Sequence, residues 1–172
     1  MFYTFNKTDK GIQGKAFEMA IKDALHRKNA HRVSPCGQSD FRYNSFNYEV
    51  KQNGTCIQYH EGEKIMKGSN RILYATHIAY TIAEETEENI SIEVDLLNTE
   101  IFILDRQQFA EFLLENGYVK VNEARGQLNI QTCYNYKKDA YHGKVGKYIE
   151  DWARDNEIDD DIVSLIYDGV EG

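Results

Sequence analysis

Two carboxylates, an ammonium group and an amide are spaced along residues 39–60 in a way that suits cation and phosphate chemistry: Asp40, Glu49, Lys51 and Gln58. Apolar and polar residues alternate through this stretch, which is typical of β-strands. Asn44-Ser45 is expected to form a two-residue hairpin loop, which sets Asp40 across from Glu49. Asn53-Gly54 is a stronger hairpin signal and sets Glu49 beside Gln58. This register predicts a three-stranded antiparallel meander with all four side chains on its polar face.

Two carboxylates that face each other across a sheet repel, and such a pair destabilises the sheet. A divalent cation removes the conflict, because Mg²⁺ (or Mn²⁺) prefers carboxylate, phosphate and water oxygens. Lys51, two residues after Glu49, points from the same face of its strand. A cation and an ammonium group at one place both stabilise negative charge that develops on a phosphodiester. The competing interpretation is a solvated polar face on which Lys51 pairs with Asp40.

The elements that must position these residues predict a single α/β domain. Residues 15–28 carry apolar side chains at helical spacing, and a second helix is expected after the capping residue Asp105. Further helices are expected over 145–153 and 159–167. The remaining pattern predicts a polar loop over 61–70, strands within 71–82, 100–104 and 118–136, and an acidic turn or helical fragment over 84–89.

Asp40, followed after eight residues by Glu49-Val50-Lys51, resembles the motif of the PD-(D/E)xK nuclease superfamily, which has the restriction-endonuclease-like fold. The order of a helix, three antiparallel strands that bear the motif, then a helix and a further strand is also similar. The resemblance covers roughly residues 11–115. Ser39 stands where the family often has proline, and no helix is evident between the third and fourth core strands.

The resemblance implies a role for each matching residue. Asp40 and Glu49 would bind the metal together with the Val50 carbonyl, and Lys51 would position or activate the attacking water. Glu18 occupies the place of a helical glutamate that often joins the site, and Gln58 matches a polar residue on the following strand. The competing interpretation of Glu18 is a surface glutamate that pairs with Lys22 one helical turn later. The fold expected is α+β, a central mixed sheet flanked by helices, and the activity is metal-dependent hydrolysis of DNA or RNA.

The charge distribution separates a body, residues 1–149, from an acidic helical tail, residues 150–172. The tail holds nine acidic residues and one basic residue, which accounts for the whole net charge of −8, so the body is neutral and nucleic acid, DNA first, stays a possible partner. Four lysines among tyrosines form the best patch for a nucleic-acid backbone, although a solvated face explains them equally well: Lys137, Lys138, Lys144 and Lys147. The apolar positions of the tail suggest that it packs on the body, on a second copy or on another protein.

A rival function is a catalytically silent nuclease-fold protein that binds and inhibits a nucleic-acid-handling enzyme, such as a phage anti-defence protein. An acidic surface can imitate the phosphates of DNA toward a basic partner. The three cysteines are scattered, which favours a reducing, cytoplasmic setting. No run of apolar residues is long enough to cross a membrane, and the first residues lack the order of a signal peptide.

Overall fold

The structure is a computed structural model that describes residues 2–29, 34–36, 39–52, 56–58, 71–122, 127–130, 134–135, 140–141 and 145–171. The helices within these ranges are α1 (Ile12–Asn29), α2 (Arg106–Glu115), α3 (Val145–Asn156) and α4 (Ile162–Glu171), with a 3₁₀ turn η1 (Leu96–Asn98). The strands are β1 (Phe2–Asn6), β2 (Ser34–Cys36), β3 (Ser39–Tyr43), β4 (Phe46–Gln52), β5 (Cys56–Gln58), β6 (Arg71–Ala75), β7 (Tyr80–Glu85), β8 (Asn89–Val94), β9 (Phe102–Asp105), β10 (Val119–Asn122), β11 (Gln127–Ile130), β12 (Tyr134–Asn135) and β13 (Ala140–Tyr141).

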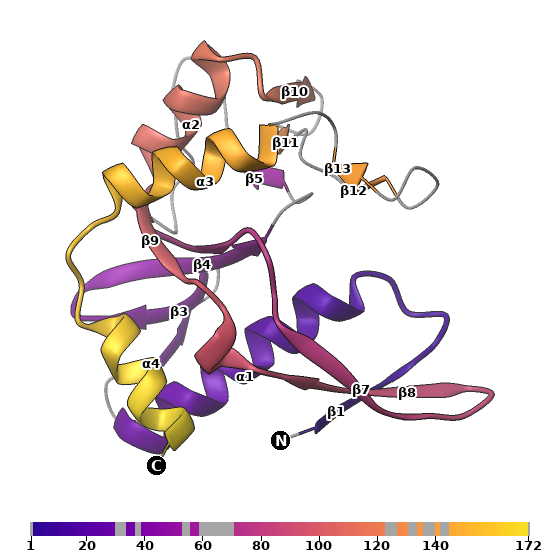
Figure 1. Cartoon of the computed structure of the whole chain (residues 1–172). Helices are drawn as coiled ribbons and strands as arrows, with labels where there is room; N and C mark the ends of the chain where they lie inside the picture. Colours follow the sequence, from indigo (N-terminus) through magenta and orange to yellow (C-terminus); the bar gives the residue numbers. More distant parts are fainter. Residues whose placement is uncertain are drawn as a thin grey trace.

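A mixed five-stranded sheet with the order β2-β3-β4-β6-β9 lies at the centre of the fold, and helices cover both of its faces (Figure 1). The strands β2, β3 and β4 are antiparallel neighbours, β4 and β6 are parallel, and β9 is antiparallel to β6. Leu73 and Ala75 of β6 join the hydrophobic cluster beneath α1 and α4, whereas Ile72 and Tyr74 join the cluster beneath α2 and α3. The fold is therefore mixed α/β, as the sequence predicts.

The hairpin of β3 and β4 confirms the first predicted turn and its register. Phe41 pairs with Tyr48 and Tyr43 pairs with Phe46 across the strands. Asn44 and Ser45 have φ values of 48° and 69°, the positive values that a two-residue type I′ turn needs at both positions. Phe41 and Tyr48 stack on the face of the sheet that α1 and α4 cover, with ring centroids 5.0 Å apart.

The prediction that residues 56–60 form the third strand of this meander is wrong, because β4 has β3 and β6 as its neighbours in the sheet. The strand β5 pairs instead with β11 in a separate sheet of order β10-β11-β5. The three antiparallel strands of the central sheet are β2, β3 and β4, with the motif on the second and third. Asn53-Gly54 and the polar loop over 61–70 lie outside the described residues. A strand has only two edges, so the parallel pairing of β4 with β6 excludes the second hairpin from this sheet.

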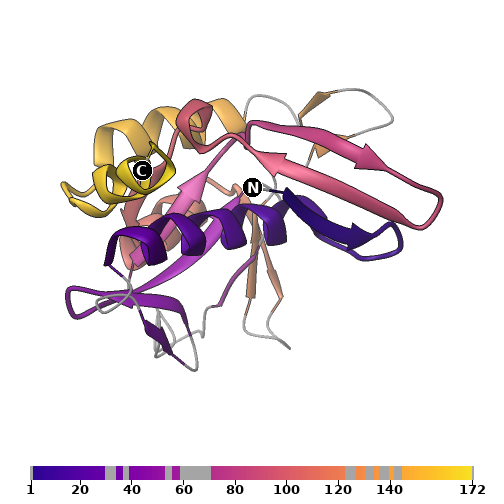
Figure 2. The ribbon, with the colours of Figure 1, turned by 90° about the horizontal axis from the view of Figure 1, so that it is seen from below.

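A three-stranded sheet of order β1-β8-β7 extends past the N-terminal end of α1 (Figure 2). The sequence pattern predicts neither β1 nor β8, and the acidic stretch 84–89 proves to be the tip of the β7–β8 hairpin. Every residue of β7 is exposed. Tyr3 of β1 and Ile92 of β8 are buried against α1, which anchors this sheet to the body.

The helices agree with the sequence pattern, with small shifts at their ends. In α2, Asp105 Oδ2 accepts a hydrogen bond from Gln108 N at 3.0 Å, which confirms Asp105 as the N-cap. Residue 150, where the charge distribution divides body from tail, lies inside α3. No helix in the described part of the chain is long and apolar enough to span a bilayer.

A buried polar cluster joins the segment between α3 and α4 to the central sheet. The Arg71 guanidinium lies 2.6 Å from Asp160 Oδ2 and stacks on the Phe46 ring, 3.5 Å from its centroid. The Tyr48 hydroxyl donates to the same Asp160 carboxylate. Ile162 and Ile166 of α4 are fully buried among α1 residues. The C-terminal helix is therefore part of the core of the domain.

The packing of α4 on α1 depends on the missing side chain of Gly169. A Cβ added there would lie 2.1 Å from the backbone oxygen of Ala24. Gly169→Ala is therefore expected to destabilise the protein by about 1–3 kcal/mol, although the same change in an open helix stabilises by about 1 kcal/mol. Urea denaturation checks the sign, with Ser164→Ala on the exposed part of α4 as the control. A Gly169→Ala protein as stable as the wild type would show that the two helices are not in close contact.

Candidate functional site

The first candidate residue, Asp40, is held at the start of the β3–β4 hairpin. Its Oδ2 accepts a hydrogen bond from the backbone N–H of Val50 on β4, at 2.7 Å. The side chain is partly buried. The Asp40 carboxyl thus occupies a fixed position beside the middle of the Glu49-Val50-Lys51 motif.

Glu18 of α1 approaches the same carboxyl from the neighbouring helix. Phe17 is fully buried against the sheet, so the next residue along α1 stands at the rim of the interface. A side-chain hydrogen bond between the Glu18 and Asp40 carboxyls shifts the pKa of each group. Lys22 Nζ lies 2.8 Å from Glu18 Oε1. The surface pairing of Glu18 with Lys22 and the contact with Asp40 are therefore both present.

The crowding of the two carboxyls separates their pKa values. Burial raises the pKa of Asp40 to about 6, and the charge of Glu18 adds to the rise, while the Val50 N–H opposes it. Burial also acts to raise the pKa of Glu18, but the hydrogen bonds with Lys22 and Asp40 and the charge of Lys51 outweigh it, so its pKa is lowered. Below about pH 6 the protonated Asp40 donates to the Glu18 carboxylate, and above it two like charges face each other.

The second candidate pair, Glu49 and Lys51, lies on the opposite face of β4 and meets a residue that the sequence pattern does not indicate. Glu49 Oε1 lies 3.0 Å from Lys51 Nζ, and Glu49 Oε2 lies 3.0 Å from Arg106 Nη1. Arg106 is the first residue of α2 and is only 3% exposed. Burial lowers the pKa of the Arg106 guanidinium, and the Glu49 charge raises it.

The two groups meet at β4, yet they do not form one cluster of carboxylates. Asp40 makes its contacts with α1 and the β4 backbone, whereas Glu49 makes its contacts with Lys51 and α2. Lys51 is the link, because its charge also acts on Glu18. This region lies toward the C-terminal ends of the parallel strands β4 and β6, where Gln52 pairs with Ala75. Open α/β sheets usually bind their ligands at that edge.

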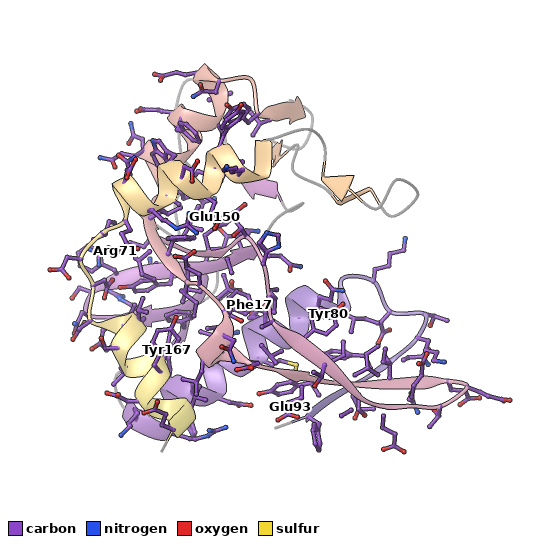
Figure 3. All side chains as sticks on the ribbon, viewed as in Figure 1. Phe17, Arg71, Tyr80, Glu93, Glu150 and Tyr167 are labelled. Carbon is purple, nitrogen blue, oxygen red and sulfur yellow. The ribbon has the colours of Figure 1, made fainter. Side chains whose placement is uncertain are left out.

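Helix α3 covers the same edge of the sheet from above. Glu150 points from α3 toward the end of β6, where Thr76 Oγ1 donates to its Oε2 at 3.4 Å (Figure 3). Lys147, one turn earlier on α3, is exposed. The other three lysines of the predicted backbone-binding patch lie outside the described residues.

Gln58 does not share a sheet with the other candidates. It lies on β5 opposite Gln127 of β11, and its side chain is outside what the structure describes. The Val50 side chain packs against the hydrophobic core, and its backbone N–H is the group that holds Asp40. The predicted common face of Asp40, Glu49, Lys51 and Gln58 is thus wrong for two reasons. The β3–β4 register runs from Tyr43–Phe46 to Phe41–Tyr48, and beyond it the Asp40 carboxyl binds the Val50 N–H in place of a position across from Glu49. Gln58 is absent from this sheet because β5 pairs with β11.

The Glu18–Asp40 pair brings two carboxyls together from α1 and β3. No group of three or more His, Cys, Asp or Glu residues in the described ranges is arranged to hold a metal ion. Mg²⁺, however, commonly uses one or two carboxylates and completes its shell with water and substrate phosphate. A raised carboxyl pKa beside a second carboxylate is the expected electrostatic signature of such a pair.

Arg106 could have been suspected from its position in the sequence. It follows the N-cap Asp105 directly, so its positive charge lies in the first turn of a helix, where the macrodipole disfavours it. A buried arginine in that position needs a compensating anion, and here Glu49 supplies it.

Comparison with protein-family models, curated proteins and solved structures finds no match to this chain, so an assignment of function rests on these side chains and on the motif.

Proposed function

We propose that this chain is a metal-dependent nuclease that hydrolyses phosphodiester bonds of nucleic acid, DNA in the first place. The observation that carries the proposal is a pair of carboxyls held from two different elements, Asp40 by the Val50 N–H and Glu18 by Lys22. The charge of Lys51 also helps to lower the pKa of Glu18. The order of a helix followed by three antiparallel strands, with Asp40 on the second and Glu49 and Lys51 on the third, supports the resemblance to PD-(D/E)xK nucleases.

Glu18 and Asp40 would hold Mg²⁺ or Mn²⁺, which supplies Lewis-acid stabilisation of the phosphate and a more acidic bound water. The Val50 N–H fixes one oxygen of Asp40 and leaves the other oxygen for ligation. Lys22 and Lys51 keep Glu18 ionised, so that it can act as a ligand or accept a proton from the attacking water. The Lys51 ammonium would stabilise charge on the reacting phosphate.

Cleavage by the purified full-length chain tests this function directly. The substrates are single- and double-stranded DNA and RNA, each with Mg²⁺, Mn²⁺ or EDTA. We expect cleavage with either metal and none with EDTA. An Asp40→Asn protein purified in the same way is the control for a contaminating nuclease. Intact substrate under every metal condition would contradict the proposal.

A second candidate function is supported by the exposed acidic hairpin of β7 and β8. Glu84, Glu85, Glu87 and Glu88 are all exposed near its tip, although Lys7 Nζ pairs with Glu85 at 2.9 Å. Such a surface would suit a protein that binds a basic nucleic-acid-handling enzyme. This function would not require the carboxyl pair, so an Asp40→Asn protein would keep it while losing any nuclease activity.

A further inference from the structure

We infer that Lys51 and Arg106 form a binding site for a phosphodiester group, and that the Glu49 carboxylate occupies this site when no nucleic acid is bound. The inference rests on the proposed function and assigns a different ligand to each of the two groups of side chains. The Glu18–Asp40 pair holds the divalent cation, and the Lys51–Arg106 pair holds the anion. Glu49 is then not a metal ligand in the resting protein.

The charges around Glu49 favour an anion over a cation. Each of its two oxygens lies 3.0 Å from one cationic side chain, so two positive groups face a single carboxylate. The three side chains are largely withdrawn from water, with exposed fractions of 16% for Glu49, 18% for Lys51 and 3% for Arg106. The N-terminus of α2 adds a further positive partial charge beside Arg106.

A divalent cation at Glu49 would meet strong repulsion. Lys51 and Arg106 would each repel a divalent ion twice as strongly as they would repel a single charge at the same distance, and burial weakens the screening by water. The Glu18–Asp40 pair has the opposite balance, because two carboxyls face the single nearby ammonium of Lys22 and the more distant charge of Lys51. Of these two groups, a metal ion therefore prefers the carboxyl pair.

The Glu49 carboxylate fills its place imperfectly. Its Oε2 is buried and accepts no hydrogen bond from any described residue, although the Arg106 guanidinium is 3.0 Å away. A phosphodiester carries the same single charge on two non-bridging oxygens, and arginine recognises phosphate well. An exchange of the carboxylate for a phosphodiester would thus preserve the charge and improve the contacts.

The test measures binding of two probes to the full-length protein without any cleavage. A short double-stranded DNA in EDTA reports the anion site, and Mn²⁺ alone reports the metal site. We expect Glu49→Gln to bind DNA about 10-fold more tightly, because the competing carboxylate is gone, and to bind Mn²⁺ as the wild type does. Lys51→Ala is expected to weaken DNA binding about 10-fold and to leave Mn²⁺ binding intact. Glu115→Gln, at the exposed C-terminal end of α2, is the matched control.

The two ideas fail in different ways. Weaker DNA binding by Glu49→Gln, or its loss of Mn²⁺ to the same extent as Asp40→Asn, would overturn the anion site. A wild-type protein that binds DNA but no Mn²⁺ would overturn the proposed function and leave the anion site standing. If Glu49→Gln does not fold because Arg106 loses the opposite charge of Glu49, the Lys51→Ala protein decides, since Glu49 still pairs with Arg106 there. Unchanged DNA affinity in Lys51→Ala would then reject the inference.

Discussion

The Asp40→Asn protein is expected to lose metal-dependent cleavage by more than about 100-fold and yet to be more stable than the wild type at pH 7 without metal. Replacing even an outer-sphere partner of a metal site commonly costs about 10–100-fold, and Asp40 is proposed as a direct ligand. The gain in stability follows from geometry. The amide oxygen of the substituted side chain would still accept from the Val50 N–H, and its NH₂ group would donate to Glu18 where two carboxylates now repel.

The gain should depend on pH in a defined direction. The folded protein holds a proton on Asp40 up to a pKa of about 6, against an ordinary value of 3.8. The folded wild type therefore binds more protons than the unfolded chain between about pH 4 and pH 6, and it loses stability as the pH rises through that window. The amide of the Asp40→Asn protein does not titrate. Its advantage over the wild type should be complete above about pH 6 and absent below about pH 4.

Thermal unfolding in EDTA at pH 4 to 7 checks both statements, and for a chain of this size each kcal/mol corresponds to about 2–4 °C. Added Mn²⁺ should raise the melting temperature of the wild type and not that of Asp40→Asn. Asp155→Asn, on the exposed part of α3, controls for the loss of a negative charge. If Asp40→Asn were less stable than the wild type at every pH, Asp40 would have a structural role.

The parts of the fold that the sequence predicts are those set by local chemistry. The Asn44-Ser45 turn determines the β3–β4 register, because both residues adopt positive φ and the strands on either side alternate. Asp105 marks the start of α2 by its hydrogen bond with Gln108, three residues further along the chain. Helix α1 is evident from its apolar spacing, which places Phe17 in the core and Glu18 at its rim. The pairing of Glu18 with Asp40 in one site, however, comes from the resemblance to the PD-(D/E)xK motif and not from these local patterns.

The parts that the sequence does not predict depend on contacts between distant segments. The parallel pairing of β4 with β6 joins residues that no turn connects, and Asn53-Gly54 offers a local alternative that the central sheet does not use. Strand β1 is short and is recognisable only beside β8. Arg106 approaches Glu49 because α2 begins where β9 ends, two strands away from β4. The alternation of apolar and polar residues along β4 cannot reveal which charged side chain of a covering helix will lie against it.

The Lys51→Ala protein is expected to lose more than about 100-fold in cleavage and to keep its fold. An ammonium group that stabilises charge on the reacting phosphate commonly contributes at that level. The fold should survive because Glu49 keeps its ion pair with Arg106 and because the change removes no residue of either hydrophobic cluster. Circular dichroism and the melting temperature check the fold, and initial rates with Mg²⁺ check the activity.

Lys22→Ala is the matched control for this loss, because it also removes an ammonium group near Glu18, at 2.8 Å in the wild type. Lys22 lies near the middle of α1 with 41% of its side chain exposed, whereas 18% of the Lys51 side chain is exposed. An exposed ion pair on a helix contributes only a few tenths of a kcal/mol, so Lys22→Ala should lower the rate less than about 10-fold. Equal losses in the two proteins would mean that general positive charge, and not the position of Lys51, supports the reaction. Full activity in a folded Lys51→Ala protein would show that the reaction does not need Lys51. The motif would then lose most of its weight as support for the nuclease function.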